Sequence, residues 1–486
     1  MNRRDFICGA AMTSIGCGVG PTFLTGCQSR GGGFREPERD LSVDAESDIV
    51  VAGGGPAGVA CAVAAARGGR KVTLLEARHC LGGVWTGGLL AYVFDFNKSE
   101  IGWEIIRRLD DLGARRIDRP PPGEVGHQNG KERPKDYDLA QDWAYEPEYM
   151  KLVCEEMCAE AGVRVLLGQT VVAAYRDAAG RNVDVVVTES KSGRRAWRAR
   201  QFVDCTGDGD LAALAGCGFD LGRTPDGFGQ PATLNALVVV KDAEAIAPYV
   251  SNDPAMWSYV PMPGSDDGQH TSNHHAATLR ILADMRKAGV EPSYGTPTLF
   301  RVHGNLLMFM VNHEYKTRLD DAAAISAATL RARKEIHRLA AALAKLGGPW
   351  EDFRVAYSAE ALAQRDARRI HGRYTVTVDD VAAGSTFPDA VTTSRFGIDV
   401  HPQDADENRK FAGGYDLGRT FRPFQIPLRS CRAKDADNVY MAGRDISGDF
   451  IAHASYRVTG SAVALGEGVG RALSNSGASR VRKNNA

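Results

Sequence analysis

The sequence of 486 residues has a net charge of −1 and no long run of basic residues before the short segment 480–483. Because a nucleic-acid-binding protein needs concentrated positive charge to neutralise phosphates, nucleic acid is not expected as a partner. Cys154 and Cys158 lie one helical turn apart without the further ligands that a zinc site requires. We therefore predict that this pair packs in the core and that the chain has no metal site. The sequence also lacks an internal repeat.

The N-terminal segment 1–27 lacks an apolar run that is long enough to cross a membrane, since several glycines and Pro21 interrupt it. Its Arg3 and Arg4 resemble a twin-arginine export signal. The sequence LTGC that ends at Cys27 resembles the lipobox of bacterial lipoproteins, which would make Cys27 the lipidated first residue of the mature protein. We expect an exported protein, periplasmic or on the cell surface, that is anchored by lipid to a membrane. The alternative is an unprocessed N-terminus on a cytoplasmic protein.

Length and composition describe an ordinary globular protein, with 43% hydrophobic and 24% charged residues. A chain of this length exceeds a single ordinary core, so two lobes are expected.

Residues 48–76 read DIVVAGGGPAGVACAVAAARGGRKVTLLE, which predicts a strand, a glycine turn, a helix over about 56–67 and a second strand. The turn matches the GxGxxG pattern of dinucleotide-binding folds. Gly53 makes the sharp turn, Gly55 lets the backbone approach a pyrophosphate, and Gly58 allows the helix and strand to pack closely. The N-terminus of the helix, at Pro56 and Ala57, stabilises the phosphate charge.

The acid Glu76 follows the second strand, where it can accept hydrogen bonds from a ribose hydroxyl. Three further segments look like places where backbone lies against a long cofactor. Two of them, FVDCTGDGDLAALAG at 202–216 and NVYMAGRDISGDFIAHASYRVTG at 438–460, repeat the order of strand, glycine turn and helix. The residues that we expect at these places are Ala77, Arg78, Gly82, Gly83, Thr206, Gly207, Asp208 and Gly443.

The chain resembles the FAD-dependent oxidoreductase family of two-dinucleotide-binding-domain flavoproteins over about 48–473. The resemblance is carried by the GGGPAG turn, GGVWTGGLL, TGDGDLAALAG, QRDARRIHGRYTVTVDD (364–380), FGIDVHP (396–402), QIPLRS (425–430) and AGRDIS (442–447). It implies FAD as the cofactor. It also implies that Asp445 meets the ribityl or pyrophosphate part of FAD, and that a helix from about Ala454, near Val458, points its N-terminus at the flavin pyrimidine edge.

The expected fold is α/β, with a Rossmann-like FAD-binding lobe that is discontinuous in sequence and a second α+β lobe facing the substrate. The first lobe would take residues 48–222, with an exposed insertion at about 94–145, and residues 424–475. The second would take 223–423. A flexible tether at 28–47 and a disordered tail at 476–486 complete the chain.

Two flavin chemistries depend on cysteine. A flavin disulfide reductase needs a redox cysteine pair just after Gly82 and Gly83, and that stretch contains none, so this class is disfavoured. His79 and Cys80 raise covalent flavin attachment as an alternative. Both precede the glycine pair and are expected to face the adenosine half, so we predict non-covalent FAD.

Oxidation of a C–H bond by hydride transfer to flavin N5 also requires a base for the proton of the departing O–H or N–H group. His401, which the family resemblance favours, and His453 are the candidates, since histidine titrates near neutral pH. Arg365 and Arg369 lie four apart and are expected to share a helix face, either gripping a carboxylate or polyol or forming ion pairs with nearby aspartates. Arg457 is a further candidate for binding flavin or a substrate anion.

These observations predict an exported FAD-dependent oxidoreductase that oxidises a small polar metabolite of the sugar or hydroxy acid type. Its electrons would pass to a quinone, an electron-transfer protein or oxygen. One alternative is a flavin-dependent reductase of an unsaturated acid. An alternative of another class is a surface lipoprotein that contains FAD and binds without catalysis.

Overall fold

A computed structural model describes residues 36–94, 99–117, 127–128, 131–132, 142–223, 227–252, 259–261, 263, 270–406 and 421–475. The predicted export signal with Cys27, the first part of the tether, the C-terminal tail and much of the predicted insertion lie outside the described residues. The chain divides into a unit at Met1–Asp40, of which residues 36–40 form no helix or strand, and a unit at Leu41–Ala486 that holds every element below. No helix of the described ranges has the length and hydrophobicity that crossing a membrane requires.

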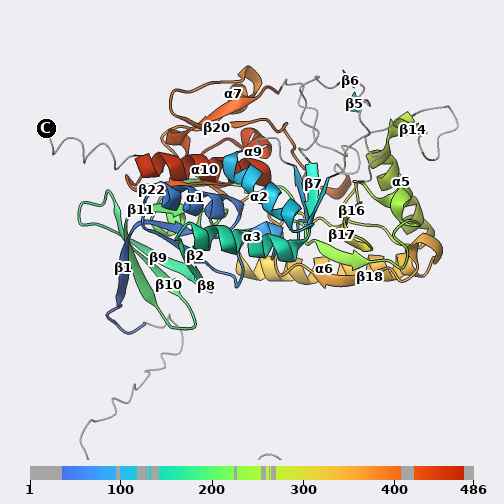
Figure 1. Cartoon of the computed structure of the whole chain (residues 1–486), viewed down its shortest axis with the longest axis horizontal. Helices are drawn as coiled ribbons and strands as arrows, with labels where there is room; N and C mark the ends of the chain where they lie inside the picture. The colour runs from blue at the N-terminus through green and yellow to red at the C-terminus, as the bar shows by residue number, and fades with distance from the viewer. Residues whose placement is uncertain are drawn as a thin grey trace, which may run out of the picture. The chain divides into compact units, whose positions relative to one another are not determined.

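The larger unit is built on a seven-stranded sheet (Figure 1). Its central strands are parallel, and β9 and β10 extend one side as an antiparallel pair. In spatial order the strands are β8 (Arg164–Leu167), β2 (Val72–Glu76), β1 (Val43–Ala52), β11 (Arg195–Asp204), β10 (Val183–Glu189) and β9 (Thr170–Arg176), with β22 (Val439–Met441) also paired to β11.

The strand register aligns the carboxyl ends of the parallel strands. Ala52, at the end of β1, pairs with Leu75 of β2 and with Asp204 of β11. Asp204 in turn pairs with Met441 at the end of β22. The three glycine turns that follow β1, β11 and β22 therefore leave the sheet at one edge, which is where open α/β sheets bind ligands.

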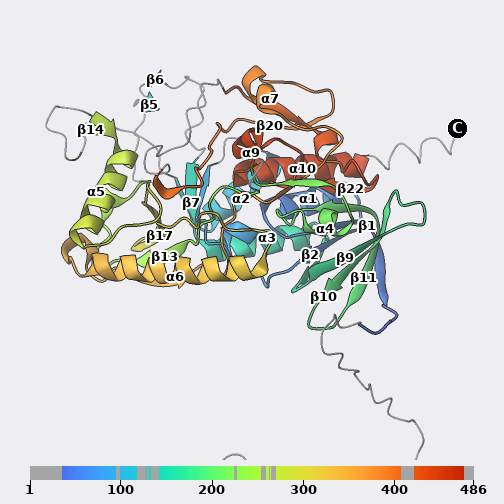
Figure 2. The same ribbon diagram turned by 180° about the vertical axis from the view of Figure 1, so that it is seen from behind.

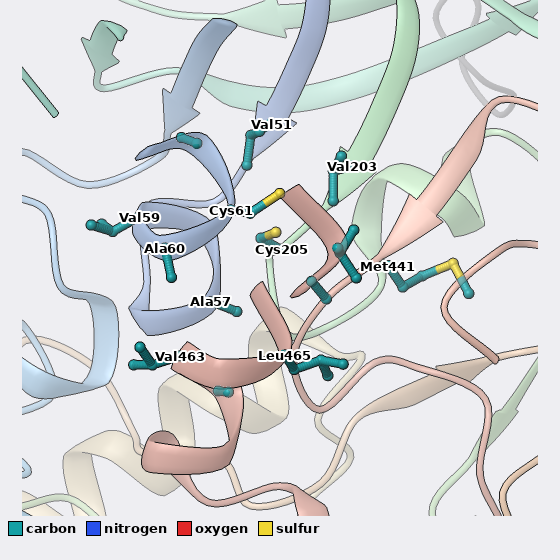
Figure 3. Close-up of a cluster of buried hydrophobic side chains, with 14 of the residues drawn as sticks. Val51, Ala57, Val59, Ala60, Cys61, Val203, Cys205, Met441, Val463 and Leu465 are labelled. Carbon is teal, nitrogen blue, oxygen red and sulfur yellow. The ribbon is translucent and has the colours of Figure 1, made fainter. Parts of the chain in front are cut away.

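Helix α1 (Pro56–Arg67) packs between this sheet and helix α10 (Thr459–Asn475) (Figure 3). Alanine, valine and glycine make up most of α1 because the two helices approach closely. A Cβ atom on Gly466 would lie 2.1 Å from the carbonyl oxygen of Ala57, and one on Gly470 would lie 2.4 Å from that of Cys61. Gly466 and Gly470 thus allow α10 to pack closely on α1.

The described part of the stretch predicted as an exposed insertion includes core residues, and the rest of it lies outside the described residues. The described part contains α2 (Glu100–Asp111), whose Ile101, Ile105 and Leu109 are buried. Helix α2 is amphipathic, but the polar residues around it in the sequence make this difficult to recognise. It begins at the Ser99 cap and contacts α10 and α3 (Pro147–Glu160). Helix α3 carries Cys154 and Cys158, both fully buried free thiols, so the prediction of core packing is confirmed.

A second sheet has four antiparallel strands, with α6 (Ala322–Ala344) running along it (Figure 2). Two of its strands form a hairpin whose turn includes Gly304 at φ +51°. Leu307 and Phe309 from this sheet and Ile336 and Leu343 from α6 form a separate core. The strands are β16 (Thr298–His303), β17 (Leu306–Met310), β13 (Ala236–Val239) and β18 (Arg354–Ser358).

The predicted fold class, a Rossmann-like lobe assembled from distant segments with a second α+β lobe, is confirmed. The remaining helices are α4 (Asp210–Leu214), α5 (Asn273–Lys287), α7 (Val378–Ala383) and α9 (Phe450–Tyr456), and the 3-10 helices are η1 (Gly83–Trp85), η3 (Ala247–Tyr249), η5 (Gly348–Trp350) and η6 (Leu428–Ser430). The small sheets contain β3 (Tyr92–Phe94), β4 (Arg115–Ile117), β5 (His127–Gln128), β6 (Lys131–Glu132), β7 (Asp142–Tyr145), β12 (Phe219–Leu221), β14 (Tyr259–Pro261), β15 (His270–Ser272), β19 (Arg368–Ile370), β20 (Ala390–Ser394) and β21 (Phe424–Pro427).

Candidate active site

The three glycines of the GxGxxG pattern, in the turn between β1 and α1, have different surroundings. Gly53 has φ +98°, and a Cβ atom there would lie 2.4 Å from the carbonyl oxygen of Cys205. A Cβ atom on Gly58 would lie 1.8 Å from the carbonyl oxygen of Gly53. A Cβ atom on Gly55 would meet no atom within 4 Å. The first and last glycines are therefore required by packing, whereas the middle one faces open space, as approach to a pyrophosphate requires.

Glu76 ties the end of β2 to this turn. Its Oε2 accepts a hydrogen bond from the amide of Gly54 at 2.5 Å, and its Oε1 accepts one from the amide of Arg78 at 2.7 Å. A carboxylate has about four lone-pair positions, so both oxygens keep capacity for a ribose hydroxyl. Ala77, the next residue, is exposed.

The glycine pair after β2 packs directly on the first turn. The amide of Gly82 donates to the carbonyl oxygen of Gly54 at 2.8 Å, and a Cβ atom on Gly83 would lie 2.9 Å from the Cα atom of Gly55. Arg78 donates to the carbonyl oxygen of Gly83 at 3.4 Å. The structure thus brings these predicted residues together around Gly55.

The second turn is held by Asp204, the last residue of β11. Its carboxylate accepts from the amide and hydroxyl of Thr206, at 3.1 and 2.7 Å, and from the amide of Ala212 at 2.9 Å. Burial raises the pKa of Asp204 to about 6, although these hydrogen bonds favour the ionised form. Gly207, at φ +74°, follows, and Asp208 pairs with Arg444 at 2.6 Å.

The third turn presents an unsatisfied carboxyl group. Gly443 has φ +131°, and Asp445 beyond it is fully buried. Neither carboxyl oxygen of Asp445 has a hydrogen-bond partner among the described residues. Burial, and then Asp204, raise the pKa of Asp445 well above its usual range. A buried acid without partners is costly, and the ribityl and ribose hydroxyls of FAD are donors that would satisfy it.

The open space at Gly55 and the unsatisfied Asp445 therefore fit FAD. Residues of the three turns would hold its phosphates and sugar hydroxyls. His79 packs beside Gly168, and Cys80 lies 3.6 Å from the Thr86 hydroxyl. Non-covalent attachment of FAD stays a prediction.

The single helix expected from about Ala454 is wrong. Ala454 lies inside α9, which begins at its Asp449 cap, and a second helix, α10, begins at Thr459. Arg457 and Val458 form the break between them. The sequence pattern runs on through the break, so only the structure separates the two helices and places the free N-terminus after Val458.

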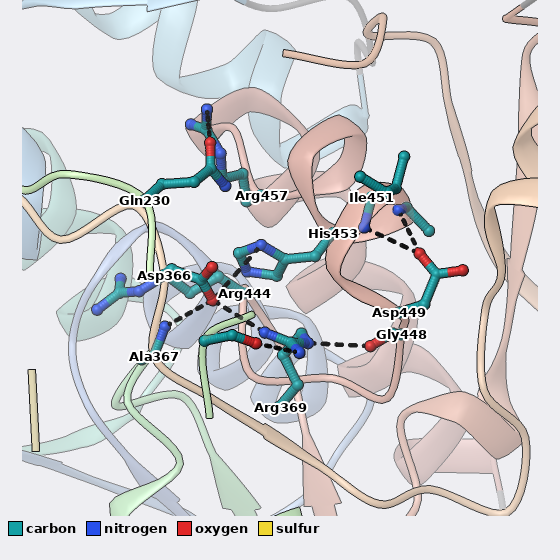
Figure 4. A network of polar contacts seen from close by, with 12 residues as sticks. Gln230, Asp366, Ala367, Arg369, Arg444, Gly448, Asp449, Ile451, His453 and Arg457 are labelled. Carbon is teal, nitrogen blue, oxygen red and sulfur yellow. Dashed lines mark hydrogen bonds and ion pairs between the residues drawn. The ribbon is translucent and has the colours of Figure 1, made fainter. Parts of the chain in front are cut away.

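Arg365 and Arg369 do not share a helix face. Arg365 lies outside any helix or strand, and Arg369 lies in the short strand β19. Arg369 donates to the carbonyl oxygens of Gly448 and Gly222, at 3.0 and 2.9 Å, and pairs with Asp366 at 3.1 Å (Figure 4). Each of its three nitrogens donates to a protein oxygen, which favours the ion-pair alternative for Arg369 over binding of a substrate.

His453 also belongs to this buried network. Its Nδ1 lies 3.9 Å from Asp366 Oδ1, and the side chain has no exposed surface (Figure 4). Burial, and then the positive charge of nearby arginines, lower the pKa of His453 well below its usual range, so the imidazole is neutral.

His401 has a different setting, because it forms a pair with a carboxylate. Its Nε2 lies 3.2 Å from Asp399 Oδ2, and its amide donates to Gln230 Oε1 at 3.0 Å. Arg457 donates to the same Asp399 oxygen at 3.1 Å and to Gln230 at 3.3 Å. Burial alone would raise the pKa of Asp399, but His401, Arg457 and Arg365 lower it, so this carboxylate is ionised.

The same cluster contains aromatic and polar residues that the sequence did not single out. The rings of His313 and Tyr294 contact each other at a tilt, with centroids 4.0 Å apart, and the ring centroid of His313 lies 5.3 Å from that of His401. His313 and Gln230 were missed because they come from separate segments, and Asp399 was passed over although it lies two residues before His401 in the FGIDVHP stretch. The local signal for His313 was the polar sequence NHE at 312–314, close after the apolar strand β17.

Comparison with models of protein families gives a match over most of the chain. Residues 48–482 match the model of the family described as FAD dependent oxidoreductase. Two thiamine thiazole synthases, from Pyrococcus horikoshii and Pyrococcus abyssi, are 37% and 36% identical over 78 residues. That segment is 16% of this chain and only 29% of each relative.

Solved structures with a similar fold have lower sequence identity to this chain. A geranylgeranyl bacteriochlorophyll reductase-like protein from Thermoplasma acidophilum has a TM-score of 0.44 and 12% identity, covering 90% of this chain and 80% of that one. L-proline dehydrogenase from P. horikoshii has a TM-score of 0.38 and 12% identity, covering 90% and 95%. With the family match over 48–482, the chain belongs to the FAD dependent oxidoreductase family and is an FAD-dependent oxidoreductase enzyme with FAD as its cofactor.

Proposed function

We propose that this enzyme oxidises a hydroxyl group of a small polar metabolite, with His401 as the base. The observation that carries the proposal is the pair formed by His401 Nε2 and Asp399 Oδ2 at 3.2 Å, beside Arg457 at the break before α10. When bound, FAD accepts the two electrons and the hydrogen of the substrate C–H bond. The remaining proton, that of the hydroxyl group, needs an acceptor in the protein as the C=O bond forms.

His401 has the properties of that acceptor. Burial, opposed by Asp399 and assisted by Arg365, lowers the pKa of His401, so the imidazole is neutral near pH 7. A neutral imidazole that donates from Nε2 to Asp399 has Nδ1 free to take a proton. Asp399 fixes the tautomer and stabilises the imidazolium that forms, while burial of the cluster keeps bulk water from competing.

The experiment is anaerobic bleaching of the bound flavin by candidate hydroxy acids and sugars. Wild-type protein should bleach with at least one of them. His401→Gln should still bind FAD but bleach about 10²- to 10⁴-fold more slowly. The matched control is His337→Gln, which replaces an exposed histidine on α6. If His401→Gln bleaches at the wild-type rate, the assignment is wrong. Reoxidation of chemically reduced flavin by an unsaturated acid, without bleaching by any hydroxyl compound, would support a reductase instead.

We further propose that the enzyme acts outside the cytoplasm and is held on a membrane surface by lipid on Cys27. The residues that support this are Arg3, Arg4 and the LTGC sequence ending at Cys27. The twin-arginine route carries folded proteins, so FAD could be inserted before export. NADPH is not available there, so the electrons would leave to a quinone, an electron-transfer protein or oxygen.

Labelling with a radioactive fatty acid tests the anchor. Wild-type protein should incorporate the label and fractionate with membranes, and Cys27→Ser should do neither. Cys17→Ser, which changes another cysteine of the same segment, is the control. Equal labelling of the wild type and Cys27→Ser would overturn the proposed anchor.

A further inference from the structure

The charges of the cluster around His401 do not balance. Asp399 is its one ionised acid, and it pairs with Arg457. Arg365 is the second cation, and its Nη1 donates only to neutral groups, the carbonyl oxygen of Pro231 at 2.7 Å and the hydroxyl of Thr233 at 2.8 Å. In the part of the chain that the structure describes, Arg365 has no ion pair.

Two acids that neighbour the cluster are paired with arginines. Asp366 pairs with Arg369 at 3.1 Å, and Glu314, next to His313, pairs with Arg331 at 2.7 Å. With neutral histidines, the cluster therefore holds one positive charge in excess. Burial, and then the charge of Arg457, lower the pKa of Arg365 to about 10, which is still high enough for it to be positive at neutral pH.

Polar atoms in the same cluster lack partners. His313 is 2% exposed, and neither of its ring nitrogens has a hydrogen bond to a described residue. The same holds for Nε2 of Gln230, which is 1% exposed, and for Nε of Arg457. Buried polar groups are normally satisfied, so these donors and acceptors indicate a polar ligand. Burial, and then Arg365 and His401, lower the pKa of His313, so it offers one donor and one acceptor, as a hydroxyl group requires.

Resting on the proposed function, we propose that the substrate is a small hydroxylated monocarboxylate, whose carboxylate binds Arg365 and whose hydroxyl lies between His401 and His313. A single negative charge cancels the excess positive charge, which a neutral sugar does not. The guanidinium of Arg365 has five donors in a planar fork, and its contacts with the described residues use one nitrogen, so two parallel bonds to a carboxylate are available. His313 is here a specificity-determining residue.

The test measures binding of matched pairs of probes to the FAD-loaded protein by calorimetry. Lactate is compared with lactamide, and propionate with propionamide, because each amide keeps the shape and loses the charge. Wild-type protein should bind each acid at least tenfold more tightly than its amide. Arg365→Met should abolish that preference, and Arg365→Lys should keep part of it.

Arg333 provides the matched control, because it also donates to one hydroxyl and one carbonyl oxygen, those of Ser358 and Ala359 at 3.0 Å each. Arg333→Met should leave the preference for acids unchanged. Asp399→Asn changes the charge in the opposite direction to Arg365→Met, because it raises the excess positive charge from one to two. It should bind acids at least as tightly as wild type while bleaching more slowly, a result that general misfolding would not produce.

The outcomes separate the two proposals. An acid preference that survives in Arg365→Met, or equal binding of acids and amides by wild type, overturns the carboxylate site even if a neutral sugar bleaches the flavin through His401. Acid binding that depends on Arg365, without bleaching by any hydroxy acid, supports the carboxylate site and overturns the proposed oxidation.

Discussion

Replacing Gly55 with alanine should separate cofactor binding from folding. Gly55 is the N-cap of α1, with φ −74° and ψ −173°, a conformation that alanine adopts readily. Its added methyl would meet no atom within 4 Å. The loss of unfolded-state entropy favours the variant by about 0.4–1 kcal/mol, whereas alanine is a poorer N-cap by a comparable amount. The FAD-free variant should therefore unfold within about 1 kcal/mol of wild type.

FAD binding should respond strongly to the same methyl group. It would occupy the space that the pyrophosphate needs to reach the first-turn amides of α1. The lost contributions are hydrogen bonds to a charged group, about 1.5–3 kcal/mol, and the attraction of the helix N-terminus, about 0.3–1 kcal/mol. A total of about 2–4 kcal/mol weakens the Kd for FAD by about 30- to 700-fold.

Gly58→Ala is the contrasting variant. Its methyl would lie 1.8 Å from the carbonyl oxygen of Gly53 and 3.2 Å from the Cβ atom of Cys205. Alanine inside a helix gains about 0.5–1 kcal/mol over glycine, but forcing backbone apart typically costs about 1–3 kcal/mol or more. This variant should be less stable than wild type even without FAD.

The assay combines denaturant unfolding of FAD-free protein with titration of FAD, followed by flavin fluorescence. The reasoning predicts normal unfolding with weak FAD binding for Gly55→Ala, and early unfolding for Gly58→Ala. Wild-type FAD affinity in a folded Gly55→Ala protein would refute the role assigned to that open space.

Three further outcomes are expected. Gly466→Ala places a methyl 2.1 Å from a backbone oxygen of α1, so its melting temperature should fall, by an amount that corresponds to about 1–3 kcal/mol; an unchanged temperature would contradict the helix contact. Arg369→Met leaves a buried carboxylate without its cation, so calorimetry should show a loss of about 3–5 kcal/mol with little change in substrate KM. Burial and the nearby arginines lower the pKa of His401 by more than Asp399 raises it. The acid limb of the pH profile of kcat/KM, which we assign to His401, should therefore lie below pH 6.5. Asp399→Asn should move this acid limb to still lower pH. An acid limb above pH 6.5 that is lost in a His401 variant but kept in a His313 variant would contradict the role of His401.

The sequence alone determined the cofactor-binding half of this protein. The turns at Gly53, Gly207 and Gly443 each follow the end of a strand with an apolar stretch, and all three have positive φ, which favours glycine over other residues. Such constraints act within a few residues, so their signal is local. Parallel strands end at one edge, so the convergence of the turns followed from the fold class.

Only the tertiary structure decided the substrate-facing half. His401 meets Gln230 across 171 residues of sequence, and Arg457 meets Asp399 across 58. It also showed that Arg369 pairs with a buried carboxylate, whereas Arg365 has no ion pair among the described residues. Spacing along the chain cannot predict such contacts, because a charge acquires its role from the partners that the fold brings within hydrogen-bond distance, and those partners come from separate segments.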